Sequence, residues 1–592
     1  MFKNWLKVFS LLLITNITTK LLSTFAIFYY GVINISFSKT LTALVFGLKF
    51  DFIVSAIFAF ILFLFFLFKS ANLNKNLLII SIVLIWLSQT GGLIYFLESG
   101  RHISYEINDI SIELTSLIQQ ALNTYPWLIT ISIIFLVLLL KILKIKPFMV
   151  TTSKIIISTI SVIFITVLII RGNIVNLPLS PLSVYALSNS SQSTVATNVT
   201  YNMLYGILGR EKHFVKKINI NHNTQDISHL YLTNKQNKNK NFKNVFIFFL
   251  ESWASVRMNK NTTPNYFNLA NQGITPKTTI AGGLRTTEGL FSTLCSWQNP
   301  LGGSVAQNRL QNNDLNCLPE ILKKHNYQTV FYQGSHKDTS GVGFFAQKLG
   351  FQTSLGKKQL KTSMYEHNSW GMHDFDIYNN ILENIKTIKK PFLIGVNTNT
   401  THDTSVPKGW NKFKDKRLNA LYFSDAALGD FMDKFKKQYP KIFNNTLFVI
   451  LADHTAGVRK QDITKFKIPL TIIANDIKAK KLNRITSQRD VAPTVLDYLG
   501  IKTPQYYLGK SLLSNNPPFF ADYYNEGKLT WIEKDKTIKI NLLNNSQQCF
   551  EKNKSVECDN KFITIRNNAL SFTKYSQDNL FNNTIIKTSA KN

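Results

Sequence analysis

The sequence predicts a protein of two parts: an α-helical membrane domain with five spans, and an α/β domain with a mostly parallel central sheet. Long apolar runs are concentrated in the first 171 residues, as expected of membrane-spanning helices. From Asn244 onward, short apolar runs alternate with helical stretches, which is typical of parallel strands covered by helices. A chain of 592 residues is also too long for a single hydrophobic core.

Five stretches are long and apolar enough to cross a bilayer, although Lys20 interrupts the first. Lysines gather before the first stretch, between the second and third, and between the fourth and fifth. The positive-inside rule therefore places the N-terminus in the cytoplasm, and an odd number of spans puts everything after Arg171 outside it. The predicted spans run roughly over residues 6–29, 51–68, 77–96, 127–143 and 155–170.

Composition divides the chain into four parts. Residues 1–171 form the membrane domain, and residues 172–242 form a connector with two prolines, a short helix around 201–208 and a lysine-rich tether. Residues 243–515 form the α/β domain, and residues 516–592 form a C-terminal extension packed on it.

The α/β domain is predicted from apolar strands that alternate with helical stretches. The predicted strands are 245–250, 329–332, 392–397, 447–451 and 469–473, and the helical stretches include 318–325, 376–387 and 420–438.

The chain carries a formal net charge of +33, from 67 basic and 34 acidic side chains. The lysines are scattered, and no recognition helix or base-stacking motif accompanies them, which argues against a nucleic-acid partner. An anionic bilayer surface explains the charge better. A general bias of the proteome toward Lys, Asn and Ile explains it about as well.

The four cysteines lie outside the apolar region and show no CxxC zinc spacing. Pairing by proximity joins Cys295 to Cys317 and Cys549 to Cys558. Two disulfides indicate an oxidising compartment, in agreement with the orientation of the spans, and buried free thiols are the alternative.

Two of the predicted strands end directly on side chains that bind metals. The run 447–451 continues into Ala452, Asp453 and His454, and the run 245–250 continues into Glu251. Ionised groups are rarely buried unless they are paired or bound to a metal, and parallel sheets carry their chemistry beyond the carboxyl ends of the strands. The two strand ends together therefore predict a metal site.

The glycine-rich segment 282–289 leads into a helix with apolar residues on one face. Thr286 or Thr287 would stand at the start of this helix, where free N–H groups favour an anion. Taken alone, the segment is explained at least as well by threonine as an ordinary N-cap. Beside metal ligands, however, a hydroxyl has a lowered pKa and becomes a nucleophile.

Four segments in this order behind five spans are more specific than any of them alone; they cover residues 249–252, 283–289, 397–402 and 452–454. Together they resemble the lipoteichoic acid synthase and phosphoglycerol transferase family of the alkaline phosphatase/sulfatase superfamily. The segments at 489–494 and 499–510 resemble the closing helix and loop of sulfatase-like domains. The resemblance implies five spans followed by an extracytoplasmic sulfatase-like catalytic domain, which corresponds to residues 243–515.

The resemblance also implies a phosphotransferase with a threonine nucleophile and one divalent cation. Glu251, Thr286, Asp453 and His454 would hold the metal, which would be Mn²⁺, with Mg²⁺ or Zn²⁺ as alternatives for this ligand set. Thr286 is preferred over Thr287 because the family's nucleophile precedes a small polar residue and then an acid.

His402 follows the predicted strand 392–397, and the resemblance implies that it contacts the substrate and acts as general acid/base. A surface-loop histidine is the alternative. His336 and Lys337 are further candidates for substrate binding, in a loop where the family carries His, Trp and Arg. Gln333 stands at that histidine position, and no matching Trp or Arg follows it. A second segment, 370–374, also resembles the family, and we expect its His373 and Asp374 to shape the cleft rather than bind metal.

We therefore expect a membrane-anchored enzyme that moves phosphoglycerol from phosphatidylglycerol, an anionic phospholipid, to a cell-envelope glycan or polymer through a phospho-threonine. The cysteines favour the periplasmic side of a bacterial inner membrane and a glycan acceptor. One rival is a phosphoethanolamine transferase of the same superfamily, and another is a non-catalytic envelope scaffold. The chain lacks the Cys/Ser-x-Pro-x-Arg segment of formylglycine sulfatases, so sulfate-ester hydrolysis is not expected.

Overall fold

The computed structural model divides into two compact units, Met1–Lys212 and His213–Asn592. The predicted lysine-rich tether and much of the rest of the connector lie outside the described residues. The structure describes residues 1–586 except for 31–34, 67–69, 100–101, 104–117, 119–120, 123–124, 149–154, 173–178, 188–189, 209–216, 223–225, 232–242, 338, 459–461, 526 and 543.

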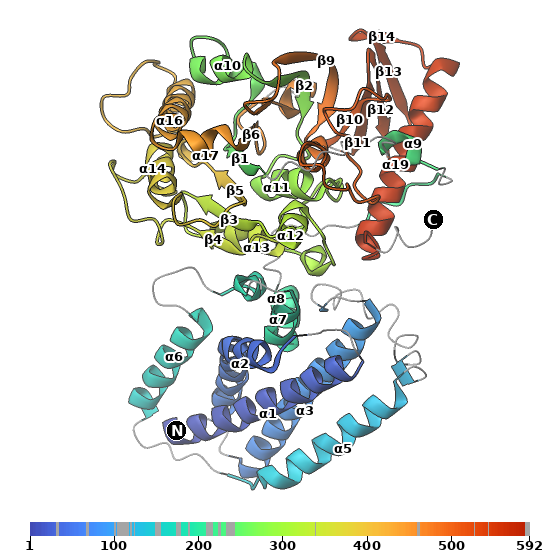
Figure 1. Ribbon diagram of the computed structural model, residues 1–592. Helices are drawn as coiled ribbons and strands as arrows, with labels where there is room; N and C mark the ends of the chain where they lie inside the picture. The colour runs from blue at the N-terminus through green and yellow to red at the C-terminus, as the bar shows by residue number, and fades with distance from the viewer. Residues whose placement is uncertain are drawn as a thin grey trace. The chain divides into compact units, whose positions relative to one another are not determined.

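The first unit is a bundle of apolar helices (Figure 1). Within its described residues, four helices are long and apolar enough to cross a membrane, and a fifth apolar helix, α6, is shorter. The helices are α1 (Phe2–Tyr29), α2 (Phe37–Phe65), α3 (Ala71–Ser99), α5 (Pro126–Leu143) and α6 (Ile155–Arg171), followed by α7 (Ser190–Ala196) and α8 (Val199–Ile207).

Helix α2 begins at Phe37, well before the predicted start at residue 51, so that part of the prediction is wrong. The polar residues that suggested a loop are accommodated inside the helix. The Lys49 ammonium lies 3.4 Å from the centre of the Phe46 ring, and Asp51 Oδ1 lies 2.7 Å from Lys20 Nζ of α1. Asn198, the N-cap of α8, also donates from Nδ2 to Asp51 Oδ1 at 2.7 Å, so this ion pair joins three segments of the bundle.

The second unit is built on a nine-stranded, mostly parallel sheet. Its strand order is β4-β3-β5-β1-β6-β8-β2-β7, with β9 paired to β2, and β4 through β6 are all parallel neighbours. The strands are β1 (Asn244–Leu250), β2 (Ile274–Ile280), β3 (Gln328–Gln333), β4 (Thr353–Leu355), β5 (Phe392–Asn397), β6 (Thr446–Ala452), β7 (Lys467–Ile468), β8 (Leu470–Ile473) and β9 (Lys480–Ser487).

Helices cover both faces of this sheet, so β1, β5 and β6 are buried along their whole length. Alternate residues of β1 enter opposite cores. Phe246 and Phe248 pack with α10, α14 and α16, whereas Ile247 and Phe249 pack with α11, α12 and α18. The helices are α9 (Ser228–Tyr231), α10 (Pro264–Ala270), α11 (Thr286–Cys295), α12 (Leu318–Lys324), α13 (Val342–Lys348), α14 (Asp374–Asn384), α15 (Thr400–Asp403), α16 (Lys416–Gln438), α17 (Pro440–Asn444) and α18 (Val491–Tyr498).

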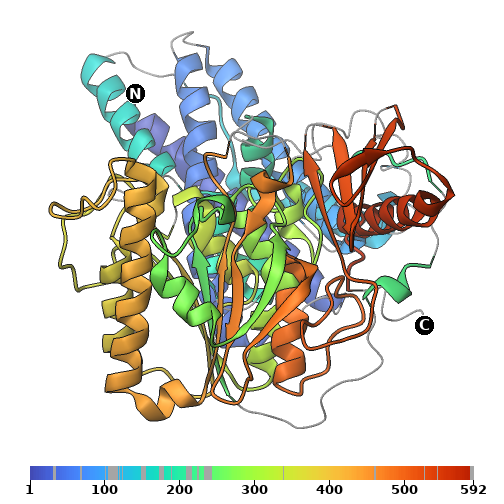
Figure 2. The ribbon, with the colours of Figure 1, turned by 90° about the horizontal axis from the view of Figure 1, so that it is seen from above.

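A second, antiparallel sheet and the helix α19 (Ile563–Phe581) lie on the opposite side of this unit from α14 and α16 (Figure 2). Trp531 stacks on Phe520 with ring centres 4.2 Å apart and contacts Phe572 of α19, which fixes the helix to the sheet. The strands are β10 (Phe520–Asn525), β11 (Lys528–Glu533), β12 (Lys536–Asn541), β13 (Gln547–Glu551) and β14 (Lys554–Val556).

Both predicted disulfides are confirmed, and the free-thiol alternative is wrong. Cys295 at the end of α11 is bonded to Cys317, the residue that precedes α12, and Cys549 of β13 is bonded to Cys558.

Candidate active site

Adjacent parallel strands bring two carboxylates to one edge of the sheet. Strands β1 and β6 are neighbours, and their register pairs Leu250 with Ala452. The residues that follow are Glu251 and Asp453, so both acids leave the sheet at the same level, beyond the carboxyl ends of the strands. This is where open parallel sheets bind ligands.

Four side chains converge at this point. Glu251, Asp453 and His454 each offer a ligand atom, and these atoms lie within 4.8 Å of one another. His454 Nε2 lies 3.3 Å from Glu251 Oε1 and 3.6 Å from Asp453 Oδ2. Thr286 Oγ1 lies 3.3 Å from Glu251 Oε2. Glu251, Asp453 and His454 are buried, and residues from three distant stretches of the chain therefore form one cluster.

The cluster fits a divalent cation. Asp453 Oδ1 accepts hydrogen bonds from the backbone N–H groups of Ser252 at 2.9 Å and His454 at 2.7 Å. Asp453 Oδ2 is buried and has no hydrogen-bond partner among the described residues. His454 Nδ1 lies 3.0 Å from the Thr455 carbonyl oxygen, which orients the ring and leaves Nε2 to face the carboxylates. Two carboxylates, a histidine and a hydroxyl suit Mn²⁺, Mg²⁺ or Zn²⁺.

The electrostatics of the cluster agree with this fit. Burial and the neighbouring charge of Glu251 raise the pKa of Asp453 to about 8. Burial lowers the pKa of His454, but the charges of Asp453 and Glu251 outweigh it and raise that pKa to about 10. Two buried carboxylates at this separation therefore require positive charge beside them, which a bound cation supplies in place of protons.

Tight packing fixes Thr286 at the start of α11. Glu288 Oε2 accepts a hydrogen bond from the Leu284 N–H at 2.6 Å, which folds the preceding loop onto the helix. A Cβ on Gly283 would lie 2.1 Å from Glu288 Oε2, and one on Gly289 would lie 2.1 Å from the Asp453 carbonyl oxygen. Glycine at these positions lets the helix approach the strand end. Thr287 is buried and bonds to Ser304 Oγ at 2.7 Å instead of facing the carboxylates.

His402 lies in α15, which follows β5, and its side chain is exposed. Its ring packs on Trp370, with ring centres 3.8 Å apart. Asp374 Oδ1 holds the preceding backbone by accepting from the N–H groups of Asn399 at 2.8 Å and Thr400 at 3.0 Å. Thr401 Oγ1 donates to the Glu251 carbonyl oxygen, so the histidine loop is fastened to the strand that carries the cluster.

Comparison with known proteins identifies this part of the chain. A sequence model described as Sulfatase matches residues 243–501. These residues form a sulfatase-family domain. Lipoteichoic acid synthase 2 of Bacillus subtilis (strain 168) is 23% identical over 305 residues, which are 44% of this chain and 46% of that protein. Phosphoglycerol transferase I of Xanthomonas campestris pv. campestris (strain B100) is 24% identical over 311 residues, which are 47% of this chain and 43% of that protein. The chain spans less than half the length of these curated relatives.

Solved structures share the fold of the sulfatase-family domain. A Vibrio parahaemolyticus protein of the alkaline phosphatase superfamily superposes with a TM-score of 0.54 at 24% identity, covering 60% of this chain and 94% of that one. The lipoteichoic acid synthase LtaP of Listeria monocytogenes gives a TM-score of 0.52 at 18% identity, covering 58% and 93%. These structures confirm the predicted fold class, and the family match together with the named relatives confirms the resemblance.

The other two sequence candidates occupy the loop after β3 of the sulfatase-family domain. The backbone carbonyl of His336 accepts a hydrogen bond from Gln333 Nε2 at 2.7 Å, and both residues are near the carboxyl edge of the sheet. The Lys337 ammonium lies over the Phe344 ring of α13, 5.2 Å from its centre. A role for either side chain in substrate binding stays a prediction.

The structure adds neighbours that sequence reasoning did not assign to the site. Trp370 contacts His402, although we placed no tryptophan beside the substrate loop. Arg257 donates from Nη1 to the Ala456 carbonyl oxygen at 2.6 Å, and a Cβ on Gly457 would lie 2.8 Å from Arg417 Cζ. Two guanidinium groups therefore flank the loop that follows His454. Arg257 and Arg417 are 160 residues apart in the sequence, so their proximity could not be predicted from it. Gly457 is the one residue of this loop whose type indicates a close contact.

Proposed function

We propose that the protein is a membrane-anchored, metal-dependent phosphotransferase. It moves phosphoglycerol from phosphatidylglycerol to a cell-envelope glycan through a covalent intermediate on Thr286. The proposal places the chain in a bacterial inner membrane with the sulfatase-family domain on the periplasmic side. The names of the relatives, lipoteichoic acid synthase and phosphoglycerol transferase, support the reaction class.

The observation that carries the proposal is the position of one hydroxyl. Thr286 Oγ1 lies 3.3 Å from a carboxylate oxygen in a cluster that fits a divalent cation and includes a buried Asp453 oxygen that accepts no hydrogen bond from the described residues. A threonine that served only as an N-cap would turn its hydroxyl to the first turn of the helix. This arrangement instead suits a nucleophile.

In the first step, Thr286 Oγ1 attacks the phosphorus of the lipid phosphodiester. A bond forms between Oγ1 and phosphorus, the Oγ1 proton passes to solvent, and the bond from phosphorus to the diacylglycerol oxygen breaks. The diacylglycerol oxygen takes a proton as it leaves, and His402 is the group we assign to donate it, because its side chain is exposed and the neighbouring Thr401 bonds to the Glu251 carbonyl oxygen. A bound cation would lower the pKa of the attacking hydroxyl and offset charge on the phosphoryl oxygens.

In the second step, an acceptor hydroxyl attacks the same phosphorus. His402, now neutral, takes the proton of that hydroxyl, and the bond from phosphorus to Thr286 Oγ1 breaks. Thr286 Oγ1 takes a proton from solvent, and phosphoglycerol is left on the acceptor. Asp374 keeps His402 in place through the backbone of Asn399 and Thr400.

Mass spectrometry of the full chain tests the proposal. After incubation with phosphatidylglycerol and Mn²⁺, we expect a phosphoglycerol adduct on the peptide that contains Thr286. Thr286→Ala should abolish the adduct, Thr286→Ser should retain it because the hydroxyl remains, and Thr287→Ala should retain it because Thr287 faces Ser304.

Three results would contradict the proposal. An adduct on another residue would remove Thr286 as the nucleophile. A phosphoethanolamine adduct after incubation with phosphatidylethanolamine, without one from phosphatidylglycerol, would favour the rival transferase. No adduct from either lipid, together with no metal binding, would favour the scaffold.

A further inference from the structure

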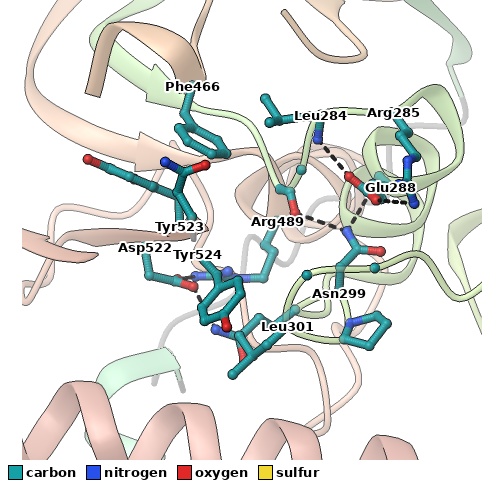
Figure 3. A pocket seen from close by; sticks show the side chains of 17 residues that line it. Leu284, Arg285, Glu288, Asn299, Leu301, Phe466, Arg489, Asp522, Tyr523 and Tyr524 are labelled. Atoms are coloured by element: carbon teal, nitrogen blue, oxygen red, sulfur yellow. Dashed lines mark hydrogen bonds and ion pairs between the residues drawn. The ribbon is translucent and has the colours of Figure 1, made fainter. Parts of the chain in front are cut away.

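A cavity of about 280 Å³ is lined by the loop that directly precedes Thr286 (Figure 3). One wall is the loop from Gly282 to Arg285 together with Glu288 of α11. The opposite wall comes from Asp522–Asn525 of β10, so the C-terminal sheet completes the cavity. Its volume is near the lower end of the range of about 300–1,000 Å³ for small-molecule sites, which suits one ring-sized group rather than a whole polymer.

The charges that line this cavity are paired with one another. Arg285 Nη1 lies 3.5 Å from Glu288 Oε1, and Arg489 Nη2 contacts Asp522 Oδ1. Gln298 Nε2 donates to the second oxygen of Asp522 at 2.7 Å. Two cations and two anions leave no net charge in the described lining. A phosphate group in this cavity would be repelled by one carboxylate for each guanidinium that attracts it. A neutral ligand therefore fits better.

Flat aromatic surfaces form one side of the cavity. Phe466 and Tyr523 stack with ring centres 4.3 Å apart. Tyr524 is partly exposed and lies against Gly302, where a Cβ would be 3.3 Å from the tyrosine ring. Figure 3 shows these three rings on one side and Arg285, Glu288 and Asn299 on the other. A ligand in this space meets aromatic rings on one side, with Tyr524 the most exposed of them, and polar groups on the opposite side.

An oriented amide contributes to the polar side. Asn299 Nδ2 donates to the carbonyl oxygens of Gly282 at 3.1 Å and Glu288 at 2.8 Å, and to Ser292 Oγ at 3.0 Å. Asn299 is 5% exposed, and its Oδ1 accepts no hydrogen bond from the described residues. A buried acceptor without a donor is unfavourable, and a ligand hydroxyl would satisfy it.

We propose that this cavity binds one neutral pyranose unit of the glycan acceptor, which rests on the proposed transfer reaction. A pyranose ring carries C–H groups on its faces and hydroxyls around its rim. Its face would lie on Tyr524, and its hydroxyls would meet Asn299 and the paired charges. A lipid acyl chain would leave those polar groups unpaired, and an anionic polymer would face Glu288 and Asp522. The cavity thus selects the sugar, and the neighbouring loop presents Thr286.

Direct binding tests the inference without turnover. The probes are maltotetraose, cellotetraose and the β-1,4-linked tetramer of N-acetylglucosamine, added to the full-length Thr286→Ala chain in a detergent without a sugar headgroup. Saturation-transfer NMR should detect at least one of them, with the strongest transfer to ring C–H protons. Tyr524→Ala should weaken that affinity about fivefold to tenfold, and Tyr524→Phe should change it less than about twofold because the ring face remains.

Matched controls make the result specific. Phe550→Ala removes a half-buried ring from β13 of the same sheet but not from the cavity, and should leave sugar affinity unchanged. The thermal unfolding temperature of each variant reports whether it folds. Glycerol 1-phosphate should not displace the sugar.

The inference is overturned if none of the three sugars binds, if Tyr524→Ala binds as tightly as the parent, if Tyr524→Phe loses as much affinity as Tyr524→Ala, or if glycerol 1-phosphate displaces the sugar. Release of diacylglycerol from phosphatidylglycerol by the wild-type chain, without any sugar present, reports on the proposed transfer reaction separately. The two proposals can therefore fail independently.

Discussion

At the scale of single residues, the two oxygens of Asp453 have different environments. Oδ1 is held by the backbone N–H groups of Ser252 and His454, and Oδ2 faces Glu251 and His454 without a hydrogen bond of its own among the described residues. The carboxylate is thus oriented by its own backbone before any ligand arrives. Ser252 can donate in this way because its φ of 62° turns the backbone sharply after Glu251.

Replacing Asp453 by Asn should weaken binding of Mn²⁺ by at least about 100-fold, because the substitution removes an anionic ligand from the cluster. Asp430→Asn, at an i,i+4 ion pair with Lys434 on α16, is the matched control and should bind metal normally. Isothermal titration of the full chain measures both. Equal affinities in the two variants would mean that the metal lies elsewhere.

At the scale of elements, helix α11 is fastened at both ends. Its first turn is held by the Glu288 contact to Leu284 and by the close approach of Gly289 to the Asp453 backbone. Its last residue, Cys295, is bonded to Cys317, which precedes α12. Thr286, the proposed nucleophile, therefore stands on a helix whose other end is covalently anchored.

The double substitution Cys295→Ser/Cys317→Ser should reduce the free energy of unfolding by about 3 kcal/mol, because the bond spans 22 residues and restricts the unfolded chain. It should also lower the rate of phosphatidylglycerol cleavage, since α11 loses its anchor. The control is Cys549→Ser/Cys558→Ser, which removes a bond that spans 9 residues and is remote from α11. Thermal unfolding and diacylglycerol release measure the two effects. Unchanged cleavage in the first variant would show that packing alone positions Thr286.

A buried carboxylate between two helices should make stability depend on pH. Asp425 of α16 accepts hydrogen bonds from the N–H groups of Asn265 and Tyr266 at the start of α10, both at 2.8 Å. Burial raises its pKa from 3.8 to about 6. Between those values the folded state binds more protons than the unfolded state, so this group lowers stability as pH rises, by about 3 kcal/mol in total.

The variant Asp425→Asn should lack the part of the pH dependence that comes from this carboxylate. The unfolding temperature, measured from pH 4 to 7, tests this. Relative to the variant, the wild type should lose stability from about pH 4 to about pH 6 and then run parallel to it. A difference between the two that stays constant across the whole range would mean that Asp425 has the same pKa folded and unfolded.

The elements that could be predicted are those buried on both faces. β1, β5 and β6 read as continuous apolar runs, and the structure places each of them within one residue of its predicted bounds. β2 and β9 were not predicted because they are partly exposed and contain Pro276 and several lysines, which obscure any apolar pattern. The strands β10 to β14 were also missed, because they show no clear apolar pattern either. Their stability comes from packing on α19.

The candidate site likewise contains residues that local sequence predicts and residues that it does not. Glu251, Asp453 and His454 could be found because each directly follows a buried strand, and local sequence alone marks such positions. Thr286 could be chosen over Thr287 only through the family resemblance. The Trp370 contact with His402 and the cavity beside β10 depend on how distant loops meet, and no local pattern in the sequence carries that information.

At the scale of the whole molecule, the two units have separate hydrophobic cores, so we expect two unfolding transitions. A ligand that binds only the folded state stabilises the unit that holds it, by about 2.7 kcal/mol at a concentration 100 times its Kd. Removing metal with a chelator should therefore lower the unfolding temperature of the sulfatase-family unit alone, and Mn²⁺ should restore it. Calorimetry of the full chain in micelles measures this. A shift of both transitions, or of neither, would contradict it.

The ion pair between Lys20 and Asp51 couples the effects of substitutions at two positions on different helices. Both side chains are at most 5% exposed, and Asn198 binds the same carboxylate. Loss of either partner would strand an uncompensated charge inside the bundle, whereas replacing both with apolar residues is far less damaging. Related sequences can change both positions together, but a change at only one of them leaves an unpaired charge inside the bundle. Substitutions on the surface cannot compensate for that charge.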